Sequence, residues 1–381
     1  STFPYRNYSS AVLSAMLASP AVALETKAKN VILMDYDTGE YLFAENAFVP
    51  VAPASMSKLM TVYVLFSKLK DGTLSLEDVF SVSENAWRTG GAASGSSTMF
   101  LPIGSKVTVE NLIKGIIIQS GNDACIVAAE NIAGSEEDFA ELMNAKAKEL
   151  GLKNSHFVNS TGLPHPDHRM SAEDLARLAQ ALIRDFPEYY SVFSQKSFTY
   201  NNILQGNRNP LLYSMPDADG LKTGHTAEAG FCLTASVKRG DRRLIGVMTG
   251  LKSNKERSEE AEKLMNWGFR EFNNYKVFKQ FQRIVSVPVY MGEEKSIDLA
   301  VDEDVIMTIA RSKARDVKLT AVYEKPVKAP VAQGDKLGEV KIEIPGGEVK
   351  TVPLYADHSI RKLGFWGRIL SNVKYLLFGA E

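Results

Sequence analysis

The 381-residue sequence has little of what marks several other classes of protein. It contains only two cysteines, Cys125 and Cys232, so it is not a disulfide-rich scaffold, and its five histidines form no Cys/His cluster with metal-ligand spacing. The formal net charge is −1, so no overall field attracts nucleic acid. The composition, 45% hydrophobic and 23% charged, is that of a globular protein. We therefore expect no metal, no other cofactor and no nucleic-acid partner.

The cysteines and two of the histidines leave alternatives open. Two buried thiols are the favoured interpretation of Cys125 and Cys232, and a disulfide between them is the alternative in an exported protein. His165 and His168 lie in the proline-containing loop GLPHPDHRM, where a local role is favoured over metal ligation.

Residues 1–24 have the pattern of a secretory signal peptide. The stretch AVLSAMLASPAVA follows Arg6, is apolar and rich in small residues, and closes on Ala21-Val22-Ala23, which fits a small-x-small cleavage site. It is too short, and too interrupted by Pro20, to span a bilayer comfortably. A buried N-terminal helix is the alternative. The pattern predicts that the protein is exported.

The segment after residue 24 mixes helical and strand patterns. Apolar and polar residues alternate over residues 30–46 on either side of an Asp-Thr-Gly turn, a pattern that predicts a β-hairpin. The pattern of residues 219–250 predicts three strands with turns between them. Helices are predicted over residues 54–72, 108–134 with an interruption at 120–122, 135–151, 171–185 and 258–272. Helices placed among antiparallel strands predict an α+β fold, with a central antiparallel sheet and helices on both faces, over residues 25–273.

From residue 274 the pattern changes to short alternating segments separated by glycine and proline turns. Such spacing predicts a small all-β domain, which we place at residues 274–358.

The pattern of residues 359–381 predicts an amphipathic helix. Its apolar residues recur at helical spacing and comprise Phe365, Trp366, Ile369, Leu370, Val373, Leu376 and Leu377. Its basic residues are Arg361, Lys362, Arg368 and Lys374. Aromatic residues beside basic ones favour a membrane-associating tail over a helix docked on the β domain.

The stretch VAPASMSKLM places Ser55, Ser57 and Lys58 at the start of a helix whose continuation is almost entirely apolar. Residues three apart on a helix have Cβ atoms about 5–6 Å apart, so the Lys58 amine can reach the Ser55 hydroxyl. Burial lowers the pKa of a lysine, which makes its neutral amine available as a base. Taken alone, the pattern favours a helix cap followed by a lysine that reaches solvent.

Two further segments favour catalysis. Ser120-Gly121-Asn122 interrupts an apolar helix with small or polar residues, where a packed helix favours leucine or alanine. Lys222-Thr223-Gly224 lies on a predicted strand and ends in a glycine, which allows the backbone of a substrate to approach. Ser-x-x-Lys, Ser-x-Asn and Lys-Thr-Gly in this order are the motif set of penicillin-binding proteins and class A β-lactamases.

Longer stretches strengthen this resemblance. SGNDAC, ELGLKNSHFVNSTGL, SAEDLA, DGLKTGHTAEAGFCLTAS and EAEKLMNWGF resemble the low-molecular-weight penicillin-binding proteins that are D-alanyl-D-alanine carboxypeptidases. The resemblance extends through the β domain and the tail. It implies the penicillin-binding/β-lactamase-like fold, peptidoglycan stem peptides as substrate and β-lactams as covalent inhibitors. It also implies a place at the periplasmic face of the bacterial inner membrane, held peripherally by the C-terminal helix.

The resemblance implies three catalytic residues. Ser55 is expected to be the acylated nucleophile, Lys58 to take its proton, and Ser120 to relay a proton to the leaving amine. Acylation would release the terminal D-alanine of a stem pentapeptide. A β-lactamase of the same fold is one alternative, although the middle motif is Ser-Gly-Asn, no deacylating glutamate loop is evident and an extra β domain is present. A catalytically weak cell-wall binding protein is the other.

The resemblance also implies five substrate-binding residues. Asn122 is expected to hold the peptide amide of the substrate, and Lys222 and Thr223 to face its terminal carboxylate. Gly224 leaves room for the substrate strand. His225 is expected to contribute its backbone N–H, together with that of Ser55, to the oxyanion hole, and no proton-transfer role is assigned to its side chain.

Overall fold

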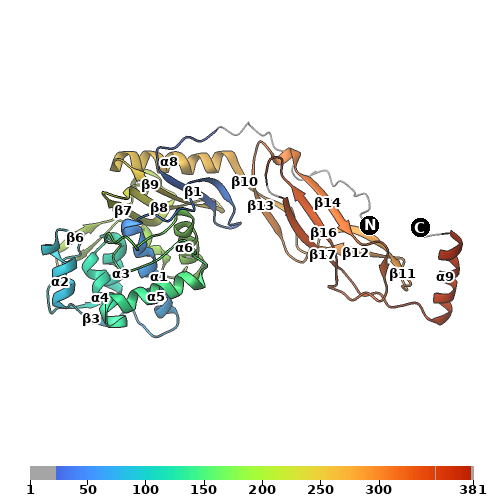
Figure 1. Cartoon of the computed structure of the whole chain (residues 1–381), viewed down its shortest axis with the longest axis horizontal. Coiled ribbons are helices and arrows are strands. Elements are labelled where there is room, and N and C mark those ends of the chain that lie inside the picture. The colour runs from blue at the N-terminus through green and yellow to red at the C-terminus, as the bar shows by residue number, and fades with distance from the viewer. Residues whose placement is uncertain (1–22, 348, 379–381) are drawn as a thin grey trace. The chain divides into compact units, whose positions relative to one another are not determined.

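The computed structural model describes residues 23–347 and 349–378. The chain forms two compact units, Leu24–Arg270 and the residues from Glu271 onward (Figure 1). The signal peptide predicted over residues 1–24 lies outside the described residues except for its last two positions, and it stays a prediction.

A five-stranded antiparallel sheet forms the centre of the first unit, in the order β2-β1-β9-β8-β7. Its strands are β1 (Asn30–Asp35), β2 (Tyr41–Glu45), β7 (Ala218–Thr226), β8 (Gly230–Arg239) and β9 (Arg242–Leu251). The predicted hairpin and the predicted three strands are therefore confirmed. Because β7 ends the strand order, one of its edges faces away from the sheet.

Helices cover both faces of this sheet because side chains along a strand alternate between faces. Leu33 of β1 points toward α8 (Asn254–Glu271), where a Cβ added at Gly268 would lie 2.5 Å from it. Its neighbours Ile32 and Met34 belong instead to the large core that the other helices share with the sheet. Figure 1 shows α8 on one side of the strands and α1 and α6 on the other. The predicted α+β class is confirmed.

The other elements of this unit complete that core and its border. Its helices are η1 (Ala54–Ser57), α1 (Lys58–Lys70), α2 (Glu84–Gly90), η2 (Ala92–Ser94), α3 (Val109–Ile118), α4 (Asn122–Ala133), α5 (Glu136–Glu149), α6 (Ala172–Asp185), η3 (Tyr190–Ser194) and α7 (Leu211–Ser214). Its short strands are β3 (Val79–Ser81), β4 (Lys106–Thr108), β5 (Ser197–Tyr200) and β6 (Ile203–Gly206).

Two predicted helices are divided in ways that matter for the site. The helix expected over residues 54–72 opens as the 3-10 turn η1, whose first residue, Ala54, has a left-handed φ of 51°, and only then becomes α1. The helix expected over residues 108–134 breaks at Ser120, which has a φ of 61°, into α3 and α4. Both breaks place a serine at the edge of the core. The helix expected from residue 258 begins four residues earlier, at Asn254.

The second unit is built from strands around its own hydrophobic core. A six-stranded sheet has the order β14-β16-β17-β12-β11-β15, and β10 pairs with β13. The elements are β10 (Phe272–Phe278), β11 (Arg283–Tyr290), β12 (Ser296–Ala300), β13 (Val305–Ala310), η4 (Ala314–Asp316), β14 (Lys318–Tyr323), β15 (Val327–Lys328), β16 (Lys336–Glu343) and β17 (Val349–Ala356). The predicted all-β C-terminal domain is confirmed.

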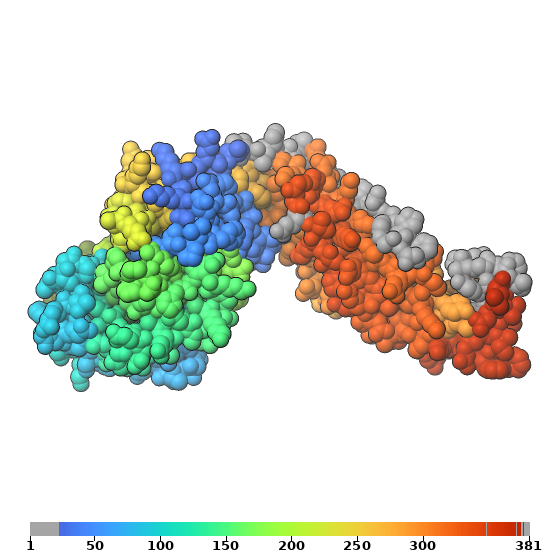
Figure 2. All heavy atoms as spheres, in the orientation of Figure 1, coloured from blue at the N-terminus to red at the C-terminus, as the bar shows by residue number. Residues whose placement is uncertain are grey.

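The chain continues into α9 (Phe365–Phe378), which Figures 1 and 2 show at the end of this unit. The helix begins later than the expected segment at residue 359, because Ile360 is buried against Val331 and the Leu363 N–H donates to the Met291 carbonyl. No described helix combines the length and apolarity needed to cross a membrane.

Candidate active site

The turn η1 brings together the serine and lysine of the first motif. Lys58 Nζ lies 2.9 Å from Ser55 Oγ, within hydrogen-bonding distance. Lys58 is only 1% exposed because α1 is surrounded by the core. The sequence prediction that the amine reaches the hydroxyl is thus confirmed by the geometry, and the lysine does not reach solvent.

Burial also sets the protonation of this lysine. Removal from water is the main reason that the pKa of Lys58 falls from 10.5 to about 8; the positive charge of Arg208 acts in the same direction, whereas Cys125 and Asp123 act in the opposite direction. With a pKa of about 8, roughly a tenth of the lysines are neutral at pH 7. Lys58 can therefore serve as a base toward Ser55.

The second motif lines the site through the break between α3 and α4. Ser120 and Asn122 are buried, and Ser120 Oγ and Asn122 Oδ1 are polar atoms without a hydrogen-bond partner among the described residues. A buried polar atom left unpaired costs about 1–3 kcal/mol, so two such atoms in one site are suited to a bound partner. Asp123 secures the adjoining segment by accepting hydrogen bonds from the N–H groups of Met99 and Leu101.

The third motif lies on β7, the strand at the end of the sheet. Lys222, Thr223 and Gly224 are all buried. A Cβ added at Gly224 would lie 3.0 Å from Ala54 Cβ and 3.2 Å from the Ser55 nitrogen, so the glycine lets β7 pack directly against the turn that carries Ser55. Burial and then the charge of Lys58 lower the pKa of Lys222 well below its usual value.

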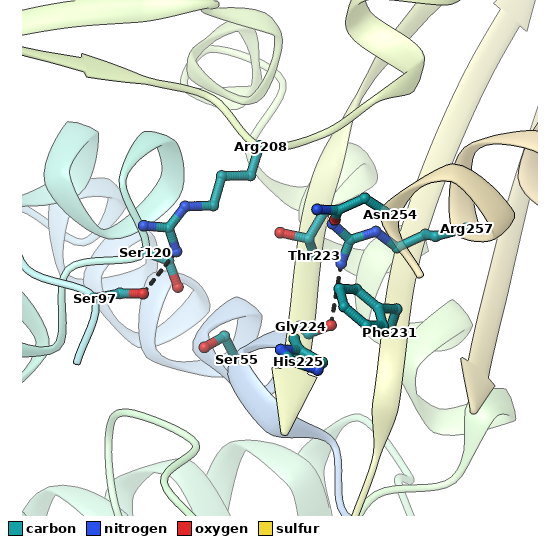
Figure 3. Close-up of a pocket in the computed structure, with 10 residues that line it drawn as sticks. All are labelled: Ser55, Ser97, Ser120, Arg208, Thr223, Gly224, His225, Phe231, Asn254 and Arg257. Atoms are coloured by element: carbon teal, nitrogen blue, oxygen red, sulfur yellow. Dashed lines mark hydrogen bonds between the residues drawn. The ribbon is translucent and has the colours of Figure 1, made fainter. Parts of the chain in front are cut away.

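A cavity of about 250 Å³ lies where these three segments meet (Figure 3). Five predicted residues line it: Ser55, Ser120, Thr223, Gly224 and His225. Lys58 contacts Ser55, and Lys58, Asn122 and Lys222 are buried without lining the cavity. The His225 ring is exposed and stacks on Phe231 at 3.8 Å, so its side chain is committed to packing.

Sequence reasoning missed several residues that line this cavity, among them two arginines and a serine. Arg208 Nη1 donates to Ser97 Oγ at 2.6 Å, opposite β7 in Figure 3. Arg257 Nη1 donates to the Gly224 carbonyl at 3.2 Å from the first turn of α8. No local pattern identifies them, because Arg208 follows a short hairpin, Ser97 lies in a Gly/Ser loop, and Arg257 precedes the expected helix start. The two arginines make the cavity cationic.

The two cysteines are buried free thiols, as the favoured interpretation predicted. Burial raises the pKa of Cys125 to about 12 and that of Cys232 to about 11, so both stay protonated near neutral pH. Neither thiol is suited to act as a nucleophile.

Comparison with known proteins agrees with this geometry. Residues 15–253 match the D-alanyl-D-alanine carboxypeptidase family, and residues 272–362 match the C-terminal domain of penicillin-binding protein 5. D-alanyl-D-alanine carboxypeptidase DacC of Escherichia coli (strain K12) is 42% identical over 341 residues, which are 89% of this chain and 85% of the relative. DacF of Bacillus subtilis (strain 168) is 36% identical over 352 residues, 90% of this chain and 88% of the relative.

Solved structures extend the likeness to three dimensions. Penicillin-binding protein 5 of Haemophilus influenzae has a TM-score of 0.80 at 36% identity and covers 90% of this chain and 99% of its own. The Streptomyces K15 DD-transpeptidase has a TM-score of 0.61 at 27% identity and covers 65% of this chain and 99% of its own. With the family match and the contact between Ser55 and the buried Lys58, the chain belongs to the D-alanyl-D-alanine carboxypeptidase family and is a serine peptidase of the penicillin-binding protein type.

Proposed function

We propose that this protein removes the terminal D-alanine from peptidoglycan stem pentapeptides through an acyl-enzyme on Ser55. The observation that carries the proposal is the 2.9 Å contact between the buried Lys58 amine and the Ser55 hydroxyl at the wall of a cationic cavity. A hydroxyl paired with a base of lowered pKa is an activated nucleophile. A cationic cavity suits a substrate that ends in a carboxylate.

Acylation would begin with attack of Ser55 Oγ on the carbonyl carbon of the penultimate D-alanine. Neutral Lys58 takes the hydroxyl proton, and the backbone N–H groups of Ser55 and His225 receive the developing oxyanion. Such donors contribute about 3–4 kcal/mol each to the transition state. The peptide bond then breaks, and the leaving nitrogen takes a proton through Ser120. Water hydrolyses the ester and regenerates the Ser55 hydroxyl.

Substrate binding would use polar groups that line the cavity, together with the buried side chains of Asn122 and Lys222. Lys222 and Thr223 face the terminal carboxylate, to which Thr223 donates its hydroxyl, and Arg257 adds positive charge from the β7 side. Asn122 Oδ1, which is buried and unpaired among the described residues, accepts from the peptide amide of the substrate. The edge of β7 that faces away from the sheet offers backbone groups to an extended peptide.

β-Lactams would acylate Ser55 because they present a strained amide beside a carboxylate, as the D-Ala-D-Ala dipeptide presents its scissile amide. The test is incubation with a diacyl peptide ending in D-Ala-D-Ala, followed by assay for free D-alanine, and labelling with a fluorescent penicillin. We expect D-alanine release and stable label at one per chain. Rapid turnover of the label would indicate a β-lactamase instead. A chain that neither releases D-alanine nor takes up label would be a cell-wall binding protein.

We also propose that residues 1–24 direct export and that α9 holds the protein at the periplasmic face of the inner membrane. The support for the anchor is the exposure of its apolar side chains, among them Trp366 at 78%, Leu370 at 76% and Leu376 at 84%. A helix docked on protein would bury these groups, whereas an interfacial helix places them among acyl chains. Arg368 and Lys374 supply attraction of about 1 kcal/mol each near an anionic surface.

A further inference from the structure

A buried histidine lies behind the nucleophile turn and has no part in the steps above. His168 is 2% exposed, and its Nε2 lies 2.8 Å from Ser57 Oγ. Its Nδ1 accepts a hydrogen bond from the Val158 N–H at 3.1 Å. Because Nδ1 is an acceptor, the hydrogen-bond pattern assigns the ring proton to Nε2, which donates to Ser57. Burial lowers the pKa of His168 to about 4, so the ring stays neutral near neutral pH.

The hydrogen-bond chain ends at the residue before the nucleophile. Since Ser57 Oγ accepts from His168, its own proton is available for the Ala54 carbonyl, which lies 3.2 Å away. Ala54 has a left-handed φ of 51°, a conformation that is costly for a residue with a Cβ. Such a conformation persists only where its surroundings hold it.

Two glycines show how closely the Ala54 peptide is enclosed. A Cβ added at Gly162 would lie 2.1 Å from the Ala54 carbonyl oxygen and 2.8 Å from Ser57 Oγ. On the other side, a Cβ added at Gly224 would lie 3.0 Å from Ala54 Cβ. The Ala54 carbonyl therefore lies between the loop at residue 162 and Ser57, and β7 packs against the other side of the turn.

The peptide plane connects this carbonyl to catalysis. The Ala54 C=O and the Ser55 N–H belong to one planar trans peptide, in which they point in opposite directions. A group that holds the carbonyl oxygen therefore also sets the direction of the N–H. The Ser55 nitrogen lies on the β7 side of the turn, since the added Cβ at Gly224 would be 3.2 Å from it.

We propose that His168 is a positioning residue that acts through Ser57 on the Ala54 carbonyl and so directs the Ser55 N–H toward the oxyanion of the acylation step. This rests on the proposed function, in which that N–H is an oxyanion donor. His168 touches neither the substrate nor Ser55. Its contribution is to keep one donor aligned where negative charge develops, and small misalignments at such a site cost up to about a hundredfold in rate.

The test measures acylation by a fluorescent penicillin with stopped-flow mixing in the full chain. His168→Met removes the donor at similar length, and Ser57→Ala removes the bridge. We expect the acylation rate constant to fall by about ten- to a hundredfold in each, with the dissociation constant of the non-covalent complex unchanged. The double variant should be no slower than the slower single variant, because both changes break the same chain. His168→Gln, which restores an N–H near Nε2, should recover most of the rate.

A spectroscopic measurement separates positioning from a purely structural role. In the penicilloyl-enzyme, hydrogen bonds from the oxyanion hole lower the stretching frequency of the ester carbonyl, which isotope labelling resolves in the infrared. We expect this band to move to higher frequency in His168→Met and Ser57→Ala and to return in His168→Gln. His165→Gln, in an exposed side chain of the same loop, is the matched control and should change neither rate nor band.

Three results would overturn the inference: unchanged acylation in both variants, slowed acylation with an unmoved carbonyl band, or no recovery in a folded His168→Gln protein. Thermal melting checks folding. If His168→Met does not fold, the acylation rate and the carbonyl band of Ser57→Ala test the inference instead, since this variant removes only one buried oxygen atom. Failure of the wild-type protein to take up penicillin would instead refute the proposed function, a result distinct from any change seen in the variants.

Discussion

Lys58 gives the sharpest expectation for the pH dependence of acylation. The amine acts as a base only when neutral, so the acylation rate should rise as pH increases through its pKa and level off above it. Burial lowers that pKa from 10.5 to about 8, which raises the neutral fraction at pH 7 by about 300-fold over an exposed lysine. Between pH 7 and pH 9 the neutral fraction rises from about 9% to about 91%, so we expect roughly a tenfold increase in rate.

The assay is the second-order rate constant of penicillin acylation measured from pH 6 to pH 10. Lys58→Arg should abolish acylation across this range, because a guanidinium stays protonated. Lys70→Arg, at an exposed position of the same helix, is the control and should retain the wild-type profile. A flat wild-type profile, a rate that falls with rising pH, or normal acylation by Lys58→Arg would refute lysine as the base.

Three further outcomes follow from the site and the tail. Ser55→Ala should lose penicillin labelling and D-alanine release completely, whereas Ser57→Ala should still be labelled, only more slowly. If labelling with a fluorescent penicillin shows the reverse pattern, Ser57 and not Ser55 is the nucleophile. Gly224→Ala should slow acylation by about tenfold or more, because the added Cβ would lie only 3.0 Å from Ala54 Cβ and displace the turn that carries Ser55. A wild-type rate of penicillin acylation in this variant would show that β7 can shift to accommodate the Cβ without disturbing that turn. Removal of residues 364–381 should leave release of D-alanine from a soluble peptide intact but abolish co-sedimentation with anionic vesicles; a truncated protein that still sediments would refute the anchor.

Those parts of the site that depend on neighbours along the chain could be predicted from the sequence. Ser55 and Lys58 are three residues apart, so helical geometry alone brings the amine near the hydroxyl, and the observed 2.9 Å contact agrees. The break at Ser120 could be predicted because small and polar residues interrupt an apolar helix. The fold class followed from periodicity, since the alternating segments became strands and the capped amphipathic segments became helices.

Only the tertiary structure decided what surrounds these residues. Arg208 and Arg257 come from separate parts of the chain, and no spacing in the sequence brings them to Ser55. The left-handed conformation of Ala54 could not be predicted from the sequence either, because alanine has no local preference for it and adopts it only where packing holds it. Ser57 and His168 are 111 positions apart, so their hydrogen bond exists only in the folded chain. Local sequence determined the nucleophile and its base, whereas long-range packing determined how the turn that carries them is held.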